Sequence, residues 1–536
     1  MLQSLQSQVP MVFSRRKVWA PLIAILLACI FVLAACGGQT PPSTGNQSSN
    51  TPTKGGNIVE GLVAEPASMD PLTSASLYDA DVMVNMYDTL LKYDVNSKIQ
   101  PDLATSYTFA SPTVLNLTLR NDVKFQDGTP FNADAVVFNI SRFLNDPASP
   151  RFTDVAPIVS VQKTGDFQVQ IKLKQPYAPM LNVLTGAVGT MLSPTAVKSL
   201  GKNLVNAPVN AGSGAFIFVE WIKGDHLLLK ANPNYWKKDA QGNRLPYLQS
   251  IRFRTITNLQ VMYNNLETAQ VQIATGIDPN DVVQAKSNPT LTYRQVTSPG
   301  FSSIQLNVSQ PPLNNVHVRR AIAYAINRQE ILDHVLQGVG FVAKGPLSPA
   351  SWAYDKNFAG ITFDLNKAKA ELAQSGVSNV SFPLVISSGN PTILQEAQFI
   401  QSQLQAVGIN ISLKQETFAT LVTDFQTFNY QSLLVGWTGS VDPDGTMYAM
   451  FYSTGGFNYT KYANAQVDSL LNSGRTTLDQ AQRVPFYQQA QNIIVQDASR
   501  VFLTHGAVAQ TTTSNVKNYP LYPSGVVDLT SVYLTK

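Results

Sequence analysis

The sequence predicts an α/β protein large enough to form several domains. Segments that alternate apolar and polar residues, as half-buried strands do, are interleaved with segments whose apolar residues stand at helical spacing. The chain of 536 residues exceeds what one hydrophobic core usually fills. A hydrophobic fraction of 44% beside only 13% charged residues describes a folded protein with a lightly charged surface.

The N-terminal segment has the layout of a secretion signal. Basic residues at 15–17 precede an uncharged stretch over 18–32, and small residues then lead to Cys36. The uncharged stretch is shorter than the roughly 20 residues of a membrane-spanning helix, so we expect a signal peptide over residues 1–35. The starting residue, Met1 or Met11, and the choice between Sec and twin-arginine export stay open.

The letters LAAC over residues 33–36 resemble the lipobox of bacterial lipoproteins, which implies lipidation of Cys36. Two or more acyl chains hold a protein stably on a membrane, at about 0.8 kcal/mol for each buried methylene. The residues after Cys36 are small or polar, so we expect a lipidated cysteine and flexible linker over 36–54. The body would then lie outside the cytoplasm, anchored to the outer face of the cell membrane or in a periplasm.

Cysteine, histidine and charge exclude several classes of function. The only cysteines are Cys29 and Cys36, so the body has neither a disulfide framework nor a catalytic cysteine. The four histidines do not stand at metal-ligand spacing, and we expect neither a metal nor a cofactor. From Cys36 onward, 35 basic residues (38 less the three at 15–17) balance 34 acidic ones, which removes the electrostatic reason for binding nucleic acid.

The first half of the body contains predicted strands and helices in alternation. A strand follows Gly55 and ends at Pro66. The next segment places four apolar residues at helical spacing: Val82, Met86, Leu90 and Leu91. Asn132 can cap a helix, residues 167–175 alternate as a strand, and residues 212–231 predict a strand, a turn and a strand.

The second half continues the pattern. Amphipathic helices are predicted near 366–376 and 392–408, each closed by a glycine. An alternating strand follows at 409–416, and a more apolar strand ends at Gly436 and Trp437.

A set of segments in a fixed order carries a family resemblance: EPASMDPL, YDTLLKYD, PDLATSY, LRNDVKFQDGTPFNADAVVF, GSGAFIFVEW, ANPNYW, VRRAIAYAINRQEI and GWTGSVDPD. From about Gly55 to the C-terminus, the chain resembles the family 5 solute-binding proteins of bacterial ABC importers. The resemblance implies a two-lobed, hinged fold of the type II periplasmic-binding-protein kind, with mixed sheets and an extra small domain on the N-terminal lobe.

On that resemblance we expect five segments in the body. They are lobe 1 (first part) at 55–92, the extra small domain at 93–204, lobe 1 (second part) at 205–305, lobe 2 at 306–505, and the return to lobe 1 at 506–536.

The implied function is a lipid-anchored receptor that takes a peptide or peptide-like solute into an interlobe cleft and delivers it to a permease. Hinged lobes can close on a ligand as rigid bodies. The expected partners are the solute, the ABC permease and ATPase subunits, and the membrane through Cys36, with the chain a monomer and not an enzyme. An oligosaccharide or other non-peptide ligand, a lipid-anchored hydrolase and a non-transporting sensor stay open as alternatives, although the sequence holds no G-x-S-x-G, P-loop or H-E-x-x-H motif.

The expected ligand contacts centre on Trp437, because a strand end that faces a cleft often holds ligands. The spacing alone equally allows a core aromatic under the loop, and the family resemblance favours the cleft. In peptide-binding relatives an Asp three residues after this Trp pairs with the ligand's α-ammonium, and here that position is Ser440. The resemblance therefore leaves open whether free peptide N-termini bind. The other candidates are Thr438, Asp442 as a substitute acid, Glu65, Asn307 and Trp352, the last three with purely structural roles as alternatives.

Overall fold

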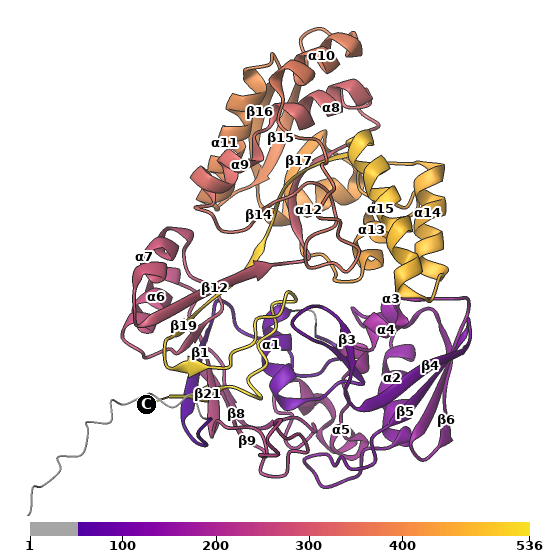
Figure 1. Ribbon diagram of the computed structural model, residues 1–536, viewed down its shortest axis with the longest axis vertical. Helices are drawn as coiled ribbons and strands as arrows, with labels where there is room; N and C mark the ends of the chain where they lie inside the picture. The colour runs from indigo at the N-terminus through magenta and orange to yellow at the C-terminus, as the bar shows by residue number, and fades with distance from the viewer. Residues whose placement is uncertain (1–51, 75, 536) are drawn as a thin grey trace, which may run out of the picture. The chain divides into compact units, whose positions relative to one another are not determined.

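Three β-sheets organise the chain (Figure 1). The structure is a computed structural model that describes residues 52–74 and 76–535, so the signal segment, Cys36 and most of the linker lie outside the described residues. The seven-stranded sheet has the order β12 (Leu291–Thr297), β19 (Ala507–Thr513), β11 (Ile273–Ala274), β1 (Asn57–Leu62), β10 (Ser250–Thr255), β9 (His226–Ala231), β8 (Phe216–Ile222). We call this sheet with its helices lobe 1.

The six-stranded sheet forms lobe 2 with the helices around it. Its order is β14 (Phe341–Val342), β18 (Arg500–His505), β13 (Phe301–Leu306), β17 (Ser432–Trp437), β15 (Ser381–Ser387), β16 (Asn410–Glu416). Both large sheets are mixed, since β1 pairs in parallel with β10 and β15 pairs in parallel with β16, while most other neighbours are antiparallel. The chain is therefore of the α/β class with mixed sheets, as predicted.

A four-stranded antiparallel sheet lies between β1 and β8 in the sequence and has its own hydrophobic core. Its order is β4 (Ala104–Ser111), β5 (Val114–Leu119), β7 (Gln168–Leu173), β6 (Ile158–Gly165). The predicted alternation of β7 is confirmed, because the side chains of Val169, Ile171 and Leu173 are buried and those between them are more exposed. Two further strand pairs are short: β2 (Leu91–Tyr93) with β3 (Ile99–Pro101), and β20 (Val516–Lys517) with β21 (Tyr533–Leu534).

The helices cover the sheets with their apolar faces. Lobe 1 and the four-stranded sheet carry α1 (Leu77–Met86), α2 (Ala133–Leu144), α3 (Phe152–Val155), α4 (Met180–Val183), α5 (Pro194–Leu200), α6 (Leu259–Glu267) and α7 (Val282–Ser287). Lobe 2 carries α8 (Val316–Ala325), α9 (Arg328–Glu330), α10 (Leu365–Ser375), α11 (Pro391–Gln405), α12 (Phe418–Thr427), α13 (Pro443–Phe451), α14 (Ala465–Thr476) and α15 (Gln480–Asp497). Single-turn 3₁₀ helices lie at Ala187–Gly189, Gly201–Val205 and Pro279–Asp281, and a π-helical turn lies at Ile331–Val335.

Several local predictions are confirmed and one is wrong. Asn132 caps α2 by accepting the amide hydrogen of Ala135, and Gly376 ends α10 in the left-handed conformation. The helix predicted to extend through Leu90 and Leu91 ends at Met86. Asp88, only two residues later, is held by hydrogen bonds from four side chains of distant segments, which draw the chain out of the helix: Ser213, Tyr235, Trp236 and Lys237.

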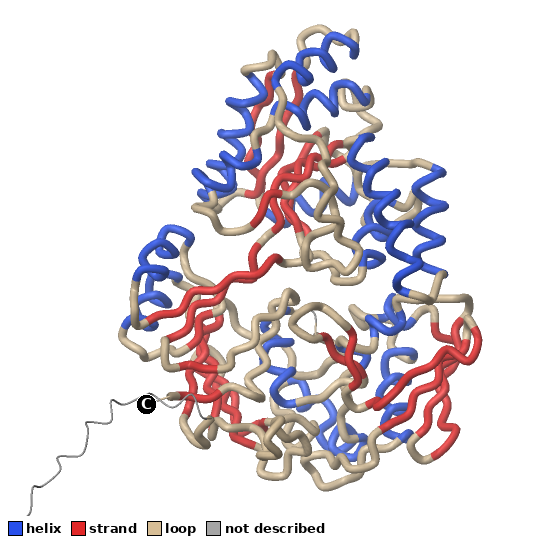
Figure 2. The backbone as a smooth tube through the Cα atoms, in the orientation of Figure 1, coloured by secondary structure: helices blue, strands red, loops and turns tan. Residues whose placement is uncertain are grey.

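The chain passes between lobe 1 and lobe 2 twice, at residues 298–300 and at Gly506 (Figure 2). The amide of Ser298 donates to the carbonyl of Gly506 at 2.8 Å, so the two crossings are joined by a hydrogen bond. The expected start of lobe 2 at residue 306 falls on the last residue of β13, yet the whole of this strand pairs with β17. Lobe 2 therefore begins at Phe301.

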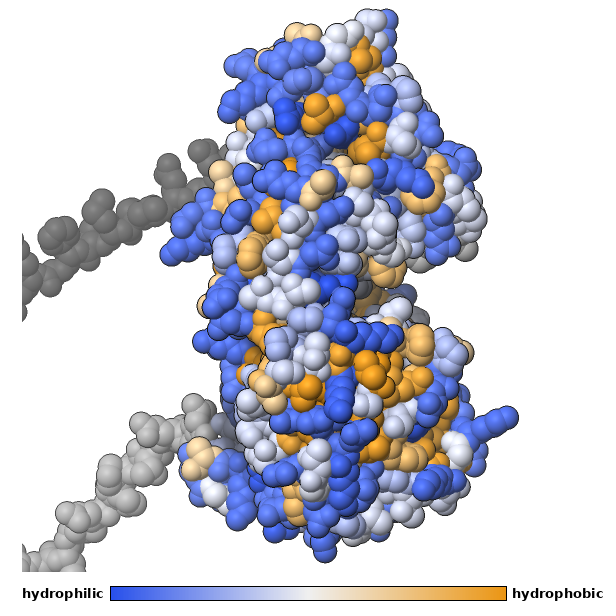
Figure 3. All heavy atoms as spheres, turned by 90° about the vertical axis from the view of Figure 1, so that its right-hand side faces the viewer, coloured by the Kyte–Doolittle hydropathy of each residue, from blue (hydrophilic) through white to orange (hydrophobic). Residues whose placement is uncertain are grey.

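The surface is mainly hydrophilic on the face that Figure 3 shows, with hydrophobic side chains gathered in smaller groups. Across the part of the chain that the structure describes, no helix combines the length and apolarity needed to span a bilayer.

Candidate ligand-binding site

The loop after Trp437 packs directly on the first crossing between the lobes. Phe301 lies opposite Trp437 in the antiparallel pair of β13 and β17. A Cβ at Gly300 would lie 2.2 Å from the carbonyl oxygen of Trp437, and a Cβ at Gly439 would lie 2.3 Å from that of Pro299. Gly439 also has φ +74°, a conformation that favours glycine. The backbones touch because both residues lack side chains, so the loop over residues 437–446, the Trp437 loop, is fixed to the hinge.

The side chain of Trp437 forms part of an aromatic row. Its ring lies 4.9 Å from that of Phe457, and Phe457 lies 6.1 Å from Tyr459 at 90°. Phe457 is 45% exposed, so the row has a face open to solvent. The indole Nε1 of Trp437 is buried and has no hydrogen-bond partner within the described chain. A buried indole N–H usually finds an acceptor, and a bound ligand can supply the one that the protein does not.

The next predicted contacts line the same loop. Thr438 is exposed and Ser440 is half-buried. The amide of Ser440 donates to the hydroxyl of Thr446 at 3.0 Å, which ties the loop back to the first turn of α13. The Ser440 side chain is a hydroxyl, so this position carries no negative charge.

The structure brings Asp442 and Trp352 together through Arg483, which the sequence analysis did not predict. Arg483 Nη1 donates to Asp442 Oδ2 at 2.9 Å, and Nη2 donates to Oδ1 at 2.8 Å. The Arg483 guanidinium also lies 4.8 Å from the ring of Trp352, which packs edge-to-face on Tyr487 at 5.8 Å. Since both Asp442 oxygens bind one arginine, the charge of this carboxylate is already compensated.

Asp444, the other acid of the loop, is compensated in the same way. Arg475 Nη2 donates to its Oδ2 at 2.7 Å, and the Asp444 side chain is only 2% exposed. The Trp437 loop therefore combines an unused indole donor, hydroxyl groups and aromatic surface with two neutralised acids. This set suits hydrogen bonds and stacking better than the binding of a free cation.

The four-stranded-sheet region reaches the same part of lobe 2 from the other side. The amide of Ala178 donates to the carbonyl of Arg475 at 3.0 Å, and the Arg475 guanidinium lies 5.6 Å from the ring of Tyr177. Burial, reinforced by the charge of Asp442, raises the pKa of the Tyr93 phenol, which donates to Asn182 at 2.5 Å. Tyr177 and Ala178 thus bring the four-stranded-sheet region into contact with lobe 2 at Arg475.

Two predicted residues have their polar groups occupied by the protein itself. Glu65 accepts hydrogen bonds from Trp221 Nε1 at 3.3 Å and from the amide of Gly224 at 3.0 Å. Asn307 is fully buried, and its Nδ2 donates to the carbonyl of Tyr430 at 3.0 Å while its Oδ1 accepts from Ser309. As ligand contacts, both stay predictions.

Sequence reasoning missed the residues that act through tertiary contact. Arg483 and Arg475 lie on α15 and α14, where a single arginine on a helix is indistinguishable from a surface charge. Phe457 and Tyr459 follow α13 in a segment that carries no periodicity. The acids of the Trp437 loop are the one sequence feature that could have pointed to these arginines, because a buried acid requires a basic partner. Among the described residues, no group of three or more His, Cys, Asp or Glu side chains is placed to hold a metal ion.

Two known proteins are similar in sequence to this chain along most of its length. Oligopeptide-binding protein AppA of Bacillus subtilis is 27% identical over 536 residues, which covers 95% of this chain and 97% of AppA. The probable D,D-dipeptide-binding periplasmic protein DdpA of Escherichia coli is 28% identical over 480 residues, covering 87% and 92%. The similarity thus covers nearly the whole length of both relatives.

Solved structures share the fold. DppA of Helicobacter pylori in complex with the peptide STSA superposes with a TM-score of 0.73 at 27% identity, covering 90% of this chain and 99% of that one. AppA of Bacillus subtilis in complex with a nonapeptide gives a TM-score of 0.72 at 25% identity, covering 91% and 100%. HbpA2 of Haemophilus parasuis gives 0.81 at 24% identity, covering 90% and 100%, and supports the fold alone. The predicted two-lobed periplasmic-binding-protein fold is therefore confirmed.

A family model described as bacterial extracellular solute-binding proteins, family 5, middle part, matches residues 98–459. This range includes the four-stranded sheet, the first crossing and the Trp437 loop. The chain belongs to family 5 of the bacterial extracellular solute-binding proteins.

Proposed function

We propose that this protein is the lipid-anchored receptor of an ABC importer and that it captures a peptide or peptide-like solute between its lobes. The observation that carries the proposal is the Trp437 indole N–H, which is buried at the end of β17 and finds no acceptor among residues 52–74 and 76–535. The Trp437 loop packs on residues 298–300, so a ligand that binds this loop and the facing lobe favours closure through its contacts with both. The similarity to AppA, an oligopeptide-binding protein, and to DdpA, a probable D,D-dipeptide-binding protein, supports the peptide class.

Anchoring and delivery complete the proposal. Lipid on Cys36 and the linker over residues 36–54 hold the receptor beside its permease, and the ATPase subunits drive release. The closed form differs in shape from the empty form, and this difference is what the permease recognises. Metabolic labelling with a palmitate analogue tests the anchor: the wild-type chain takes up label and a Cys36→Ala variant does not.

A neutral ligand is the second candidate, and a specific observation favours it. Asp442 and Asp444 are both neutralised by arginines, and Ser440 has no charge. The exposed face of Phe457 in the aromatic row is suited to stacking on a sugar ring. An oligosaccharide therefore fits the Trp437 loop on the same grounds as an uncharged peptide end.

The experiment that separates these candidates begins with native mass spectrometry of the purified chain. We expect one non-covalent small solute for each chain, identified after denaturation. A thermal-shift screen then compares di- and oligopeptides with oligosaccharides of similar size. Stabilisation by peptides alone supports the proposal, and stabilisation by oligosaccharides alone replaces it with the second candidate. Turnover of the bound solute to hydrolysis products would show an enzyme instead of a receptor.

A further inference from the structure

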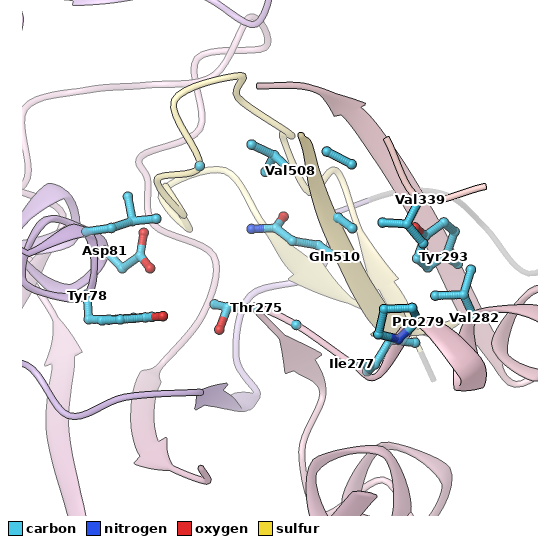
Figure 4. A pocket seen from close by; sticks show the side chains of 15 residues that line it. Tyr78, Asp81, Thr275, Ile277, Pro279, Val282, Tyr293, Val339, Val508 and Gln510 are labelled. Carbon is cyan, nitrogen blue, oxygen red and sulfur yellow. The ribbon is translucent and has the colours of Figure 1, made fainter. Parts of the chain in front are cut away.

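A cavity lies beside the crossing at Gly506, on the lobe 1 side of the hinge (Figure 4). Its volume is about 250 Å³, close to the lower end of the roughly 300–1,000 Å³ of small-molecule sites. Its walls come from α1, from β12 and β19 and from the loop around Ile277, and Val339 of lobe 2 completes them. The residues of the Trp437 loop do not line it. We call it the hinge cavity.

Two polar side chains of the hinge cavity, Asp81 and Gln510, each carry an acceptor oxygen that has no donor within the described residues. Asp81 is 1% exposed; its Oδ1 accepts the amide hydrogen of Val527 at 3.2 Å, whereas its Oδ2 has no partner in the described chain. Gln510, 4% exposed on β19, likewise has an Oε1 without a partner, and Figure 4 shows its side chain and that of Asp81 in the same cavity. A buried acceptor left without a donor costs about 1–3 kcal/mol, and more if it is charged.

A second acid adds to the negative charge. Glu60, on β1, is fully buried, and neither of its carboxylate oxygens has a hydrogen-bond partner in the described chain. Within that chain, no ion pair is formed by Glu60 or Asp81. The nearby bases are engaged elsewhere: Arg294 donates to the carbonyl of Tyr519 at 2.5 Å, and Lys286 lies 5.1 Å from the ring of Tyr293.

The remaining walls match an organic cation. Two aromatic rings, Tyr78 and Tyr293, line the cavity, and aromatic faces attract ammonium groups. The other lining side chains include Ile277, Val508 and Val339, which provide an apolar surface for the carbon skeleton of the ligand. A carboxylate among aromatic and apolar side chains is a suitable environment for an alkylammonium ion.

We propose that the hinge cavity binds an alkylammonium group. The positively charged nitrogen of the ligand would lie against Asp81 and Gln510, and its apolar body would lie against Val339 of lobe 2. This inference deepens the proposed function. It rests on that function only where it identifies the ammonium group as part of the captured solute. It assigns the cationic end of that ligand to lobe 1, because both acids of the Trp437 loop are bound to arginines. Contact with Val339 makes the site sensitive to the hinge.

Burial disfavours the charged forms of both acids. Burial and then the charge of Asp81 raise the pKa of Glu60, and burial raises the pKa of Asp81 despite the hydrogen bond from Val527. A cation beside Asp81 favours the charged carboxylate, so a bound alkylammonium ion would oppose this shift.

The test uses n-butylammonium chloride and 1-butanol, which have nearly the same shape but differ in charge. Isothermal titration calorimetry on the purified chain should show n-butylammonium binding at least tenfold tighter than 1-butanol. Asp81→Asn removes the charge but keeps an oxygen for the Val527 amide, and should weaken n-butylammonium at least tenfold. Asp79→Asn is the matched control, since Asp79 is equally buried on the same helix but does not line the cavity; its effect should stay within twofold.

A second variant keeps the test decisive if Asp81→Asn does not fold. Val339→Phe leaves every charge in place and fills the cavity from lobe 2, so it should also weaken n-butylammonium at least tenfold. Circular dichroism melts without ligand establish that each variant is folded. Equal binding of n-butylammonium and 1-butanol, or unchanged binding in both a folded Asp81→Asn and a folded Val339→Phe variant, overturns the inference.

The source of the ammonium is resolved by dialanine and N-acetyl-dialanine. If Asp81→Asn weakens dialanine by the same factor as n-butylammonium, the peptide N-terminus is the group bound. If only n-butylammonium is weakened, the cavity binds a separate amine and the inference holds for that source. If n-butylammonium binds but neither peptides nor saccharides do, the proposed function fails and the hinge cavity stands.

Discussion

Asp442 and Arg483 form a buried, bidentate ion pair, with N–O distances of 2.9 and 2.8 Å and side chains 5% and 4% exposed. The pair links the loop that follows β17 to α15, two elements far apart in the sequence. Asp442 also caps α13, because its Oδ1 accepts the amide hydrogen of Asp444 at 3.0 Å. The geometry of the Trp437 loop thus depends on a residue that no local pattern identifies.

Breaking this ion pair should destabilise lobe 2. Asp442→Asn leaves the charge of Arg483 buried without a counter-charge, and we expect a loss of about 3–5 kcal/mol in the free energy of unfolding. Urea denaturation followed by circular dichroism measures it. Adding Arg483→Met should recover at least half of the loss, because no buried charge then remains.

The exposed ion pair of Lys163 and Asp134 provides the control for that measurement. The two side chains are 37% and 65% exposed, so Asp134→Asn should change the free energy of unfolding far less than Asp442→Asn does. A loss for Asp442→Asn no larger than this control would show that the buried pair contributes little.

Removing the indole N–H of Trp437 should weaken ligand binding without weakening the fold. Trp437→Phe keeps an aromatic ring against Phe457, and the lost N–H has no partner in the part of the chain that the structure describes. We expect the ligand affinity to fall roughly fivefold, the value of about one hydrogen bond, with the melting temperature of the free protein unchanged. Trp236→Phe should do the opposite, because the Trp236 indole donates to buried Asp88 at 3.0 Å. A Trp437→Phe variant with wild-type affinity would remove the main support for the site.

Placing an acid at residue 440 should alter the preference for charged peptide ends. Ser440 is half-buried at the Trp437 loop, and Arg475 and Arg483 are already bound to Asp444 and Asp442, so an aspartate at residue 440 adds a negative charge to the loop. We expect Ser440→Asp to raise the ratio of dialanine affinity to N-acetyl-dialanine affinity about tenfold, measured by calorimetry. Ser440→Asn, which is similar in size but uncharged, should leave the ratio unchanged. An equal response to both substitutions would exclude an electrostatic origin.

The stability of lobe 2 should fall as the pH rises from about 4.5 to about 7 because of Glu396 on α11. Its side chain is 5% exposed, and burial raises its pKa to about 7. The folded state therefore binds the proton more tightly than the unfolded state, so the contribution is complete below about pH 4.5 and is lost as the pH rises through about 7. The loss amounts to about 3 kcal/mol.

Glu396→Gln removes this dependence. We expect the free energy of unfolding of the variant to vary less between about pH 4.5 and about pH 7 than that of the wild type, and to exceed it at pH values above about 7. Urea denaturation at several pH values measures both. Parallel pH profiles for the two proteins would show that Glu396 ionises in the folded state without cost.

Local patterns predicted much of the secondary structure because the signals they use are local. Alternation along β7 and the cap at Asn132 depend on residues within a few positions of one another, and both are present. The end of α1 was missed because hydrogen bonds from residues 213 and 235–237 decide it. A helical period in the sequence cannot report a competing contact from so far along the chain.

The sequence by itself determined the α/β class, the order of most elements and, through its motifs, the position of the Trp437 loop. Tertiary structure alone decided which charges remain free. Asp442 and Asp444 look available in the sequence but are neutralised by Arg483 and Arg475, whereas Asp81, within a predicted helix, lines a cavity with an unused oxygen. The physical reason is that the effective charge of a carboxylate depends on the burial and the neighbours that folding provides, and these come from parts of the chain that the sequence keeps apart.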